Sequence, residues 1–140
     1  MSLVYWDTML FVYWVEDHPQ YAVRVKAIYD KMQKRGDILC TSTFALAEVL
    51  TGPYKQGATA LVSQIRKFFR PPQLELLAFE TETADHYARI RSQYRVSPAD
   101  AIHLATAAHA GVDLLTNDRR LRGLAILGIH FVATMDVALF

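Results

Sequence analysis

Four acidic residues stand far apart in the chain, each where a strand is predicted to end or within the first turns of a predicted helix: Asp7, Glu48, Asp100 and Asp118. Asp7 ends an apolar run, and Glu48 lies inside another. Burying an ionised carboxylate beside apolar side chains costs free energy unless a positive charge compensates it. If the carboxylates converge in the fold, a divalent cation is the natural compensation. The sequence therefore predicts a metal site.

The ligand type indicates which metal and which reaction such a site would serve. Two carboxylates about 4 Å apart repel each other by roughly 1–4 kcal/mol at effective dielectric constants of about 80 to 20. A group of them therefore needs a cation or acquires raised pKa values. Hard oxygen ligands without cysteine favour Mg²⁺ or Mn²⁺ over Zn²⁺. The matching reaction is phosphodiester hydrolysis, because a divalent ion activates water and offsets the charge on the phosphate.

Each acid also has a simpler explanation. Asp100 follows a Ser-Pro pair that should start a helix, where the helix dipole favours a carboxylate by a few tenths to ~1 kcal/mol. Asp118 fits an ordinary turn. The neighbours of Glu48 leave few polar positions for a solvated helix face, and an acid that ends an apolar strand, as Asp7 does, points into the crevice of an α/β fold. A functional role is therefore favoured more strongly for Glu48 and Asp7 than for Asp100 and Asp118.

Short β-rich runs alternate with helical patterns along the chain. Strands are predicted at residues 2–6, 38–41, 74–79, 113–116 and 130–132. Helices are predicted at about residues 8–15, 19–35, 43–52, 56–69, 81–94 and 99–110, and a turn or short helix at 118–124. This alternation predicts one α/β domain over residues 1–140, with a mostly parallel, four- to five-stranded sheet covered on both faces. Ligands then bind beyond the carboxyl ends of the strands, where Asp7 and Asp118 should share one edge.

The composition fits a compact globular domain. The chain has 140 residues, of which 52% are hydrophobic and 21% charged, enough apolar material for a sizeable core. The net charge of +1 gives no overall basic field of a nucleic-acid-binding protein, although local patches can still bind RNA. Cys40 is the only cysteine, which excludes an internal disulfide and suggests a reducing cytoplasm. With no secretory signal and no membrane-spanning run, we expect a soluble protein.

Four segments around the acids form a series. They are the strand that ends in Asp7-Thr8, the helix with Ala47-Glu48-Val49, the block Ser97-Pro98-Ala99-Asp100-Ala101-Ile102-His103-Leu104-Ala105, and Thr116-Asn117-Asp118. In this order they resemble the successive motifs of PIN-domain ribonucleases, and more narrowly the VapC-type toxins of bacterial and archaeal toxin–antitoxin pairs. The likeness covers nearly the whole chain, and the block around Asp100 is its most specific part.

The resemblance implies a three-layer α/β/α PIN-like domain and a Mg²⁺- or Mn²⁺-dependent endoribonuclease that acts on structured cellular RNA. It also implies a homodimer and an antitoxin partner that occludes the site. The metal-site acids are implied to be Asp7, Glu48 and Asp100, with Asp118 as a fourth and more variable one. Thr116 and Asn117 are implied to hold an acid or a metal-bound water.

Two features depart from the family pattern. Met9 stands where the family often has a small polar residue that hydrogen-bonds near the metal, so Thr8 would have to supply that bond. The Tyr5-Trp6 pair before Asp7 is bulkier than the usual aliphatic strand ending.

Other polar and aromatic residues allow two interpretations each. His103 shares a helix face with Asp100, but its apolar neighbours favour a packed or hydrogen-bonded histidine over a metal ligand. Aromatic residues of the first helix region form either a partner surface or part of the core. Three arginines directly after the last acid either hold RNA phosphates beside the metal or form a solvated face: Arg119, Arg120 and Arg122.

Three alternatives to a toxin nuclease stay open. A catalytically silent PIN-like module would bind RNA or protein, and Met9 keeps this interpretation open. A housekeeping PIN nuclease would share the same acids. A phosphoacceptor receiver domain also has acids at strand ends, but it usually pairs two acids after strand one and has an acceptor Asp after strand three. Here Thr8 follows Asp7, and strand three ends in Phe79-Glu80.

Overall fold

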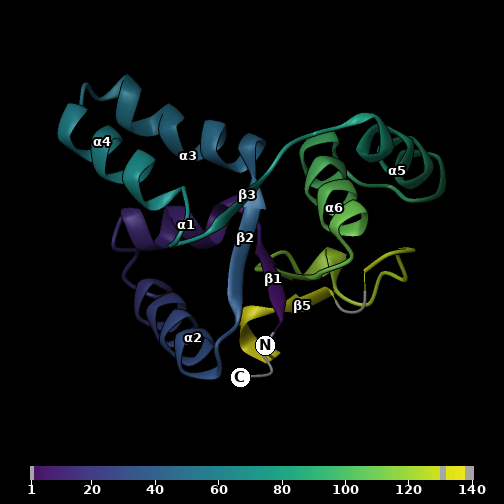
Figure 1. The fold of residues 1–140 in the computed structure, drawn as a ribbon, viewed down its shortest axis with the longest axis horizontal. Coiled ribbons are helices and arrows are strands. Elements are labelled where there is room, and N and C mark those ends of the chain that lie inside the picture. Colours follow the sequence, from purple (N-terminus) through teal and green to yellow (C-terminus); the bar gives the residue numbers. More distant parts are fainter. Residues whose placement is uncertain (1, 130–131, 138–140) are drawn as a thin grey trace.

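The computed structural model describes residues 2–129 and 132–137, which form a three-layer α/β/α domain (Figure 1). The strands are β1 (Leu3–Trp6), β2 (Ile38–Ser42), β3 (Glu75–Leu77), β4 (Asp113–Thr116) and β5 (Val132–Thr134). The helices are α1 (Thr8–Val15), α2 (Ala22–Arg35), α3 (Thr43–Lys55), α4 (Thr59–Phe68), α5 (Thr81–Gln93) and α6 (Pro98–Ala110). Short 3-10 helices follow β4 (Arg119–Leu121) and β5 (Met135–Val137). None of the described helices is long and apolar enough to cross a membrane.

The described strands form one sheet in the order β3-β2-β1-β4-β5, and every neighbouring pair is parallel. The predicted fold class is therefore confirmed. The chain leaves β1 towards β2 and β3 on one side and later adds β4 and β5 on the other, so the switch point lies between β1 and β4. Ligands bind at such a point in open α/β sheets. Receiver domains have the order 2-1-3-4-5, so the receiver alternative is wrong.

Strand β1 supplies side chains to both faces of the sheet, because successive side chains of a strand point in opposite directions. Val4 and Trp6 belong to a core shared with helices α1 to α4. Tyr5 lies in a second core with α5 and α6, which also contains the buried Cys40. The bulky Tyr5-Trp6 pair thus anchors both helical layers directly before Asp7. Cys40 is a small residue of this second core.

Helices α2 and α4 begin three residues later than predicted, β3 covers only Glu75–Leu77 of the predicted residues 74–79, and the end of α3 also differs. Helix α3 does not stop at Gly52-Pro53 but continues to Lys55. Proline restricts the residue before it mainly through a clash with that residue's Cβ and backbone, and Gly52 has no Cβ. Pro53 is also buried in the core-facing side of the helix. The described part of the fifth strand is Val132–Thr134, and His130 and Phe131 of the predicted strand lie outside the described residues.

Candidate functional site

Asp7 lies at the carboxyl end of β1, beside the switch point of the sheet. Its N–H donates to the Leu115 carbonyl of β4 at 3.1 Å, and its carboxylate caps helix α1 by accepting from the Met9 N–H at 3.2 Å. The Thr116 hydroxyl donates to its other oxygen, Oδ2. Only 9% of Asp7 is exposed. Burial raises the pKa of Asp7 from 3.8 to about 6, although the Thr116 hydrogen bond and the charge of His103 oppose the shift.

Thr116 connects Asp7 to Asp118. The Asp118 N–H donates to Thr116 Oγ1 at 3.0 Å, while the hydroxyl hydrogen of Thr116 goes to Asp7. Arg120 donates from Nε and from a terminal guanidinium nitrogen to the two oxygens of Asp118, at 3.0 and 2.7 Å. The hydrogen bond from Arg120 lowers the pKa of Asp118. Asp118 therefore lies at the predicted edge, but its charge is already paired.

Glu48 projects from α3 towards Thr8 and His103. The Thr8 hydroxyl donates to Glu48 Oε1, and His103 Nε2 lies 3.2 Å from the same oxygen. The His103 hydrogen bond, and then that of Thr8, lower the pKa of Glu48 against its partial burial. His103 itself is only 4% exposed. The sequence interpretation of His103 as a hydrogen-bonded histidine is confirmed, and the contact between Thr8 and Glu48 crosses from α1 to α3.

Asp100 lies in the first turn of α6. Ser97 is the N-cap, since its hydroxyl accepts from the Asp100 N–H at 3.1 Å, and Pro98 is the first helical residue, as predicted. The Asp100 side chain lines a hollow of about 130 Å³ together with Arg120. Its charge helps raise the pKa of Arg120, after the larger effects of the hydrogen bond and charge of Asp118. Asp100 therefore lies near the Arg120 that pairs with Asp118.

The remaining predicted site residues have other partners. The Asn117 amide donates to the Tyr13 hydroxyl at 2.9 Å. The Met9 side chain is 44% exposed, so this residue supports Asp7 only through its backbone. Arg119 and Arg122 form ion pairs with Asp136 at 3.2 and 3.7 Å. The three predicted phosphate-contacting arginines are thus held by carboxylates, and their exposed side chains border the site.

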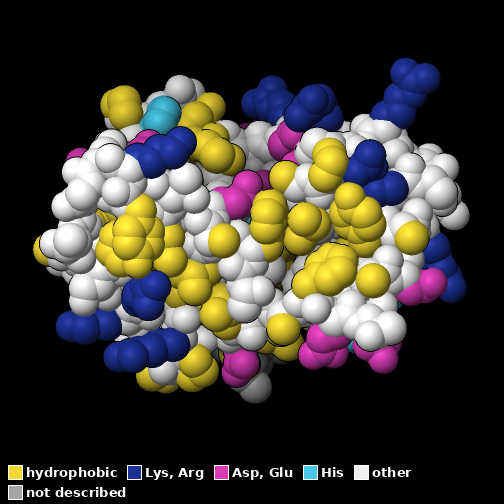
Figure 2. Space-filling model, turned by 90° about the horizontal axis from the view of Figure 1, so that it is seen from above, with side chains coloured by type: hydrophobic (Ala, Val, Ile, Leu, Met, Phe, Trp, Pro, Cys, Tyr) yellow, Lys and Arg dark blue, Asp and Glu magenta, His cyan; other side chains and the backbone are white. Residues whose placement is uncertain are grey.

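The site as a whole is an edge lined by oxygen atoms. Figure 2 looks onto the carboxyl end of the strands, where acidic side chains lie in the middle of the face between apolar side chains on either side. No ion pair in the described part of the chain involves Asp7 or Asp100. A buried carboxylate with a raised pKa, joined to a second acidic residue through a threonine hydroxyl, is a donor set that suits a hard divalent cation.

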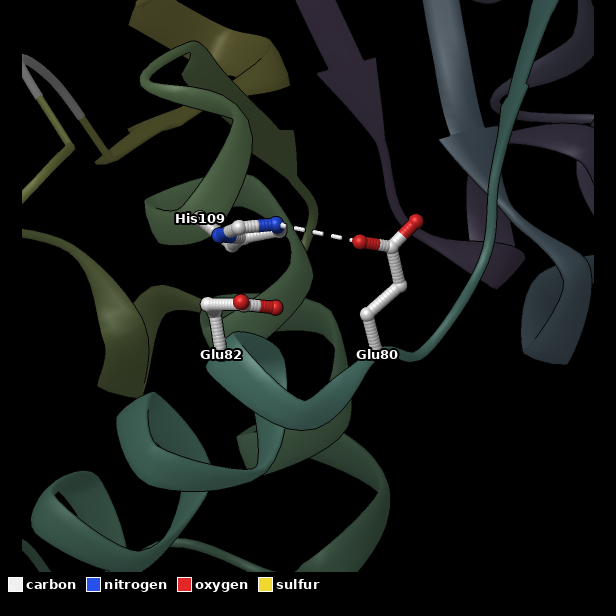
Figure 3. Close-up of side chains that lie close together, drawn as sticks. All are labelled: Glu80, Glu82 and His109. Atoms are coloured by element: carbon white, nitrogen blue, oxygen red, sulfur yellow. Dashed lines mark ion pairs between the residues drawn. The ribbon is translucent and has the colours of Figure 1, made fainter.

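A tighter acid group lies elsewhere among the described residues. Glu80, Glu82 and His109 bring one ligand atom each within 4.8 Å of one another, and all three are exposed (Figure 3). His109 forms an ion pair with Glu80 at 3.6 Å. Sequence spacing could not reveal this group, because His109 ends α6 whereas the two glutamates start α5. The four predicted acids do not form a group of this compactness.

Comparison with known proteins identifies solved structures that share this fold. No protein with a curated description matches the chain. The structure resembles a chain of VapBC2 from Rickettsia felis bound to a DNA fragment from their promoter, with a TM-score of 0.75 and 18% identity over 94% of this chain and 98% of that chain. DNA-bound VapBC from Salmonella typhimurium gives a TM-score of 0.75 and 22% identity over 96% and 99% of the two chains. FitAcB from Neisseria gonorrhoeae gives 0.63 and 23% over 83% and 88%.

At these identities the structural likeness concerns the fold. The sequence itself matches the PIN domain description over residues 4–127, which includes all four predicted acids. The chain therefore belongs to the PIN domain family, whose members are in general nucleases that use divalent metal ions.

Proposed function

We propose that the protein is a Mg²⁺- or Mn²⁺-dependent endoribonuclease, and that it is the toxin of a toxin–antitoxin pair. The observation that carries the nuclease proposal is Asp7. Its carboxylate is buried at the switch point of a PIN sheet, its pKa is raised to about 6, and the described residues give it no ion-pair partner. A carboxylate in this state gains most from a bound cation.

Asp7, Glu48 and Asp100 would hold the metal ion, with Asp118 as a fourth acid. When bound, the ion activates water and offsets negative charge on the phosphate and the leaving oxygen. In the hydrolysis, the oxygen of a water molecule bonds to phosphorus and the bond from phosphorus to the ribose 3′-oxygen breaks. The 3′-oxygen takes up a proton, and the other fragment keeps the phosphate.

The protein's own residues fix the acids for this reaction. Thr116 and the Met9 backbone orient Asp7, and Thr8 orients Glu48. Arg120 pairs with Asp118 and lines one hollow with Asp100, and its planar guanidinium suits a phosphate as well as a carboxylate. We propose that incoming RNA phosphate competes with Asp118 for Arg120, and that Arg119 and Arg122 add to this contact.

The surface beside Glu48 supports an antitoxin partner. Helices α1 and α4 border an apolar hollow of about 240 Å³, lined by Phe11, Trp14, Val15, Leu61, Ile65, Phe68 and other residues. A second hollow of about 360 Å³ shares Val15 and Leu61 with the first and is also lined by Glu48. An apolar segment seated on α1 and α4 would therefore extend to Glu48 and occlude it. We also propose that the chain forms a homodimer and works in the cytoplasm.

The nuclease proposal is tested by RNA cleavage. Purified protein with Mn²⁺ should cut RNA, and Asp7→Asn or Asp100→Asn should abolish cutting while circular dichroism stays native. Asp30→Asn, an exposed acid on α2, is the matched control and should cut like the wild type. Undiminished cutting by both site variants would refute the site assignment. Calorimetry with Mn²⁺ distinguishes the silent-module alternative, since such a module should bind no ion at these acids.

A further inference from the structure

A chain of hydrogen bonds runs from Tyr5 on β1 through the buried His103 on α6 to Glu48 on α3. We infer that Tyr5 and His103 are positioning residues that hold Glu48 in place for the metal ion, without contacting the substrate themselves. This inference rests on the proposed nuclease function, because it assigns Glu48 a role at the reacting phosphate. It concerns residues that the metal and phosphate contacts above do not use.

The chain consists of short, direct contacts across the fold. The Tyr5 hydroxyl lies 2.7 Å from His103 Nδ1, and both side chains are buried. On the other side of the ring, Nε2 lies 3.2 Å from Glu48 Oε1 and 3.1 Å from Thr8 Oγ1. The contacts therefore join β1, α1, α3 and α6 around one imidazole.

The chemistry of the partners fixes the direction of each hydrogen bond. The Thr8 hydroxyl gives its hydrogen to Glu48, so both oxygens that face Nε2 are acceptors. Nε2 must then carry a hydrogen, and whenever the ring is neutral Nδ1 is therefore the acceptor. The Tyr5 hydroxyl supplies the missing donor.

Packing also fixes the plane of the ring. Tyr5 meets the imidazole edge to face at a centroid distance of 5.7 Å, and Phe44 packs against it at 5.5 Å. By contrast, 35% of the Glu48 side chain is exposed, so packing alone leaves its carboxylate free to turn. The packed imidazole therefore gives this partly exposed carboxylate a fixed partner besides Thr8, as the supporting residues of metal ligands generally do. The hydrogen bond to His103 also explains why position 5 has a tyrosine, whereas an aliphatic residue would be enough to fill the core.

The first test is spectroscopic and needs neither metal nor RNA. Nitrogen-15 NMR of the metal-free protein at pH 8 should show the His103 hydrogen on Nε2, with Nδ1 unprotonated. Tyr5→Phe should make the ring populate both tautomers, because Nδ1 loses its donor. Tyr29→Phe, which removes a hydroxyl from a half-buried tyrosine of the other core, should leave the signals unchanged. A wild-type hydrogen on Nδ1 would overturn the inference.

The second test separates positioning from packing. His103→Ala should weaken Mn²⁺ binding in calorimetry and lower kcat by about 10- to 100-fold, the usual effect of losing a supporting residue. The KM for RNA should stay within about threefold, because His103 does not touch the substrate. His103→Gln keeps a donor near the Nε2 position and should recover part of both losses. Equal losses in the alanine and glutamine variants would overturn the inference.

Two outcomes need separate interpretation. If His103→Ala does not fold, Tyr5→Phe carries the test: it should lower Mn²⁺ affinity and kcat relative to Tyr29→Phe, and equal values would refute the role of the hydroxyl. If the wild type does not cut RNA, the proposed function fails. The tautomer and the Mn²⁺ affinities then still decide whether the chain of hydrogen bonds holds Glu48.

Discussion

At the scale of single residues, the energetics of the site centre on Asp7. Its carboxylate accepts hydrogen bonds from Thr116 and from the Met9 backbone, yet burial still raises its pKa. Desolvation therefore outweighs the hydrogen bonds in the metal-free protein. The ionised form of Asp7 is a source of instability that a bound cation would remove.

The pH dependence of stability should reveal this state. Because the pKa of Asp7 is about 6 in the folded protein and 3.8 ordinarily, the folded state holds the proton more tightly. Its stabilising effect is fully present below about pH 3.8 and is lost as the pH rises through about 6. We expect the free energy of unfolding of the wild type, relative to Asp7→Asn, to fall by on the order of 3 kcal/mol between pH 4 and pH 8.

Urea unfolding in EDTA at several pH values measures this difference. Comparing the two proteins at each pH cancels the contribution of the other titrating groups. A difference that stays constant from pH 4 to pH 8 would show that Asp7 is ordinarily solvated, and would remove the main support for a cation there.

The acids could be located from the sequence, but the contacts between them could not. A carboxylate that follows an apolar strand or opens a helix is a local pattern, so the sequence predicts which elements carry Asp7 and Asp100. The bond from Thr116 to Asp7 depends on the pairing of Trp6 with Leu115. That register is a tertiary property, so no spacing in the sequence encodes it. The contact between Tyr5 and His103 is also tertiary, so the sequence does not predict it either.

At the scale of elements, the placement of Asp100 depends on how α6 begins. The Ser97 hydroxyl accepts from the Asp100 backbone and satisfies one of the free N–H groups of the first turn. Ser97→Ala should therefore lower the free energy of unfolding by about 1 kcal/mol and reduce Mn²⁺ affinity, because the first turn carries a predicted ligand. Urea denaturation and calorimetry measure the two effects.

Ser63→Ala is the control for this prediction. Ser63 is exposed within α4, where alanine is the better helix former, so this variant should be as stable as the wild type or slightly more so. If Ser97→Ala matched Ser63→Ala in stability and in Mn²⁺ affinity, the cap would not be what positions Asp100.

The helices also indicate where local rules fail. A Gly-Pro pair ordinarily marks the end of a helix, yet α3 runs through it to Lys55. A missing Cβ at Gly52 and the buried ring of Pro53 offset the lost hydrogen bond, and burial is known only once the neighbouring helix is in place. The start of α6 was predicted correctly because Ser97 and Pro98 act within a single turn, without any distant partner.

At the scale of the whole molecule, the apolar hollow and the acidic edge are adjacent, so partner binding and catalysis should be separable by mutation. Leu61→Glu puts a charge into both hollows and should abolish capture of the antitoxin in a pull-down. RNA cutting should persist, because Leu61 lies on α4, outside the hydrogen bonds that hold Asp7 and Glu48 in place. Val23→Glu, at an apolar residue of α2 that is 78% exposed, should bind the antitoxin normally. Normal capture by Leu61→Glu would place the partner on another surface.

Metal binding should stabilise the whole fold, because Asp7 and Glu48 join helices α1 and α3 to the sheet. At about 100 times its dissociation constant, Mn²⁺ should raise the free energy of unfolding by about 2.7 kcal/mol, which thermal unfolding would register against an EDTA baseline. Asp7→Asn should lose most of this gain. Glu82→Gln disables the exposed Glu80, Glu82 and His109 group and should keep it. The reverse pattern, with the gain lost in Glu82→Gln and kept in Asp7→Asn, would move the metal site from the carboxyl edge of the sheet to the contact between α5 and α6.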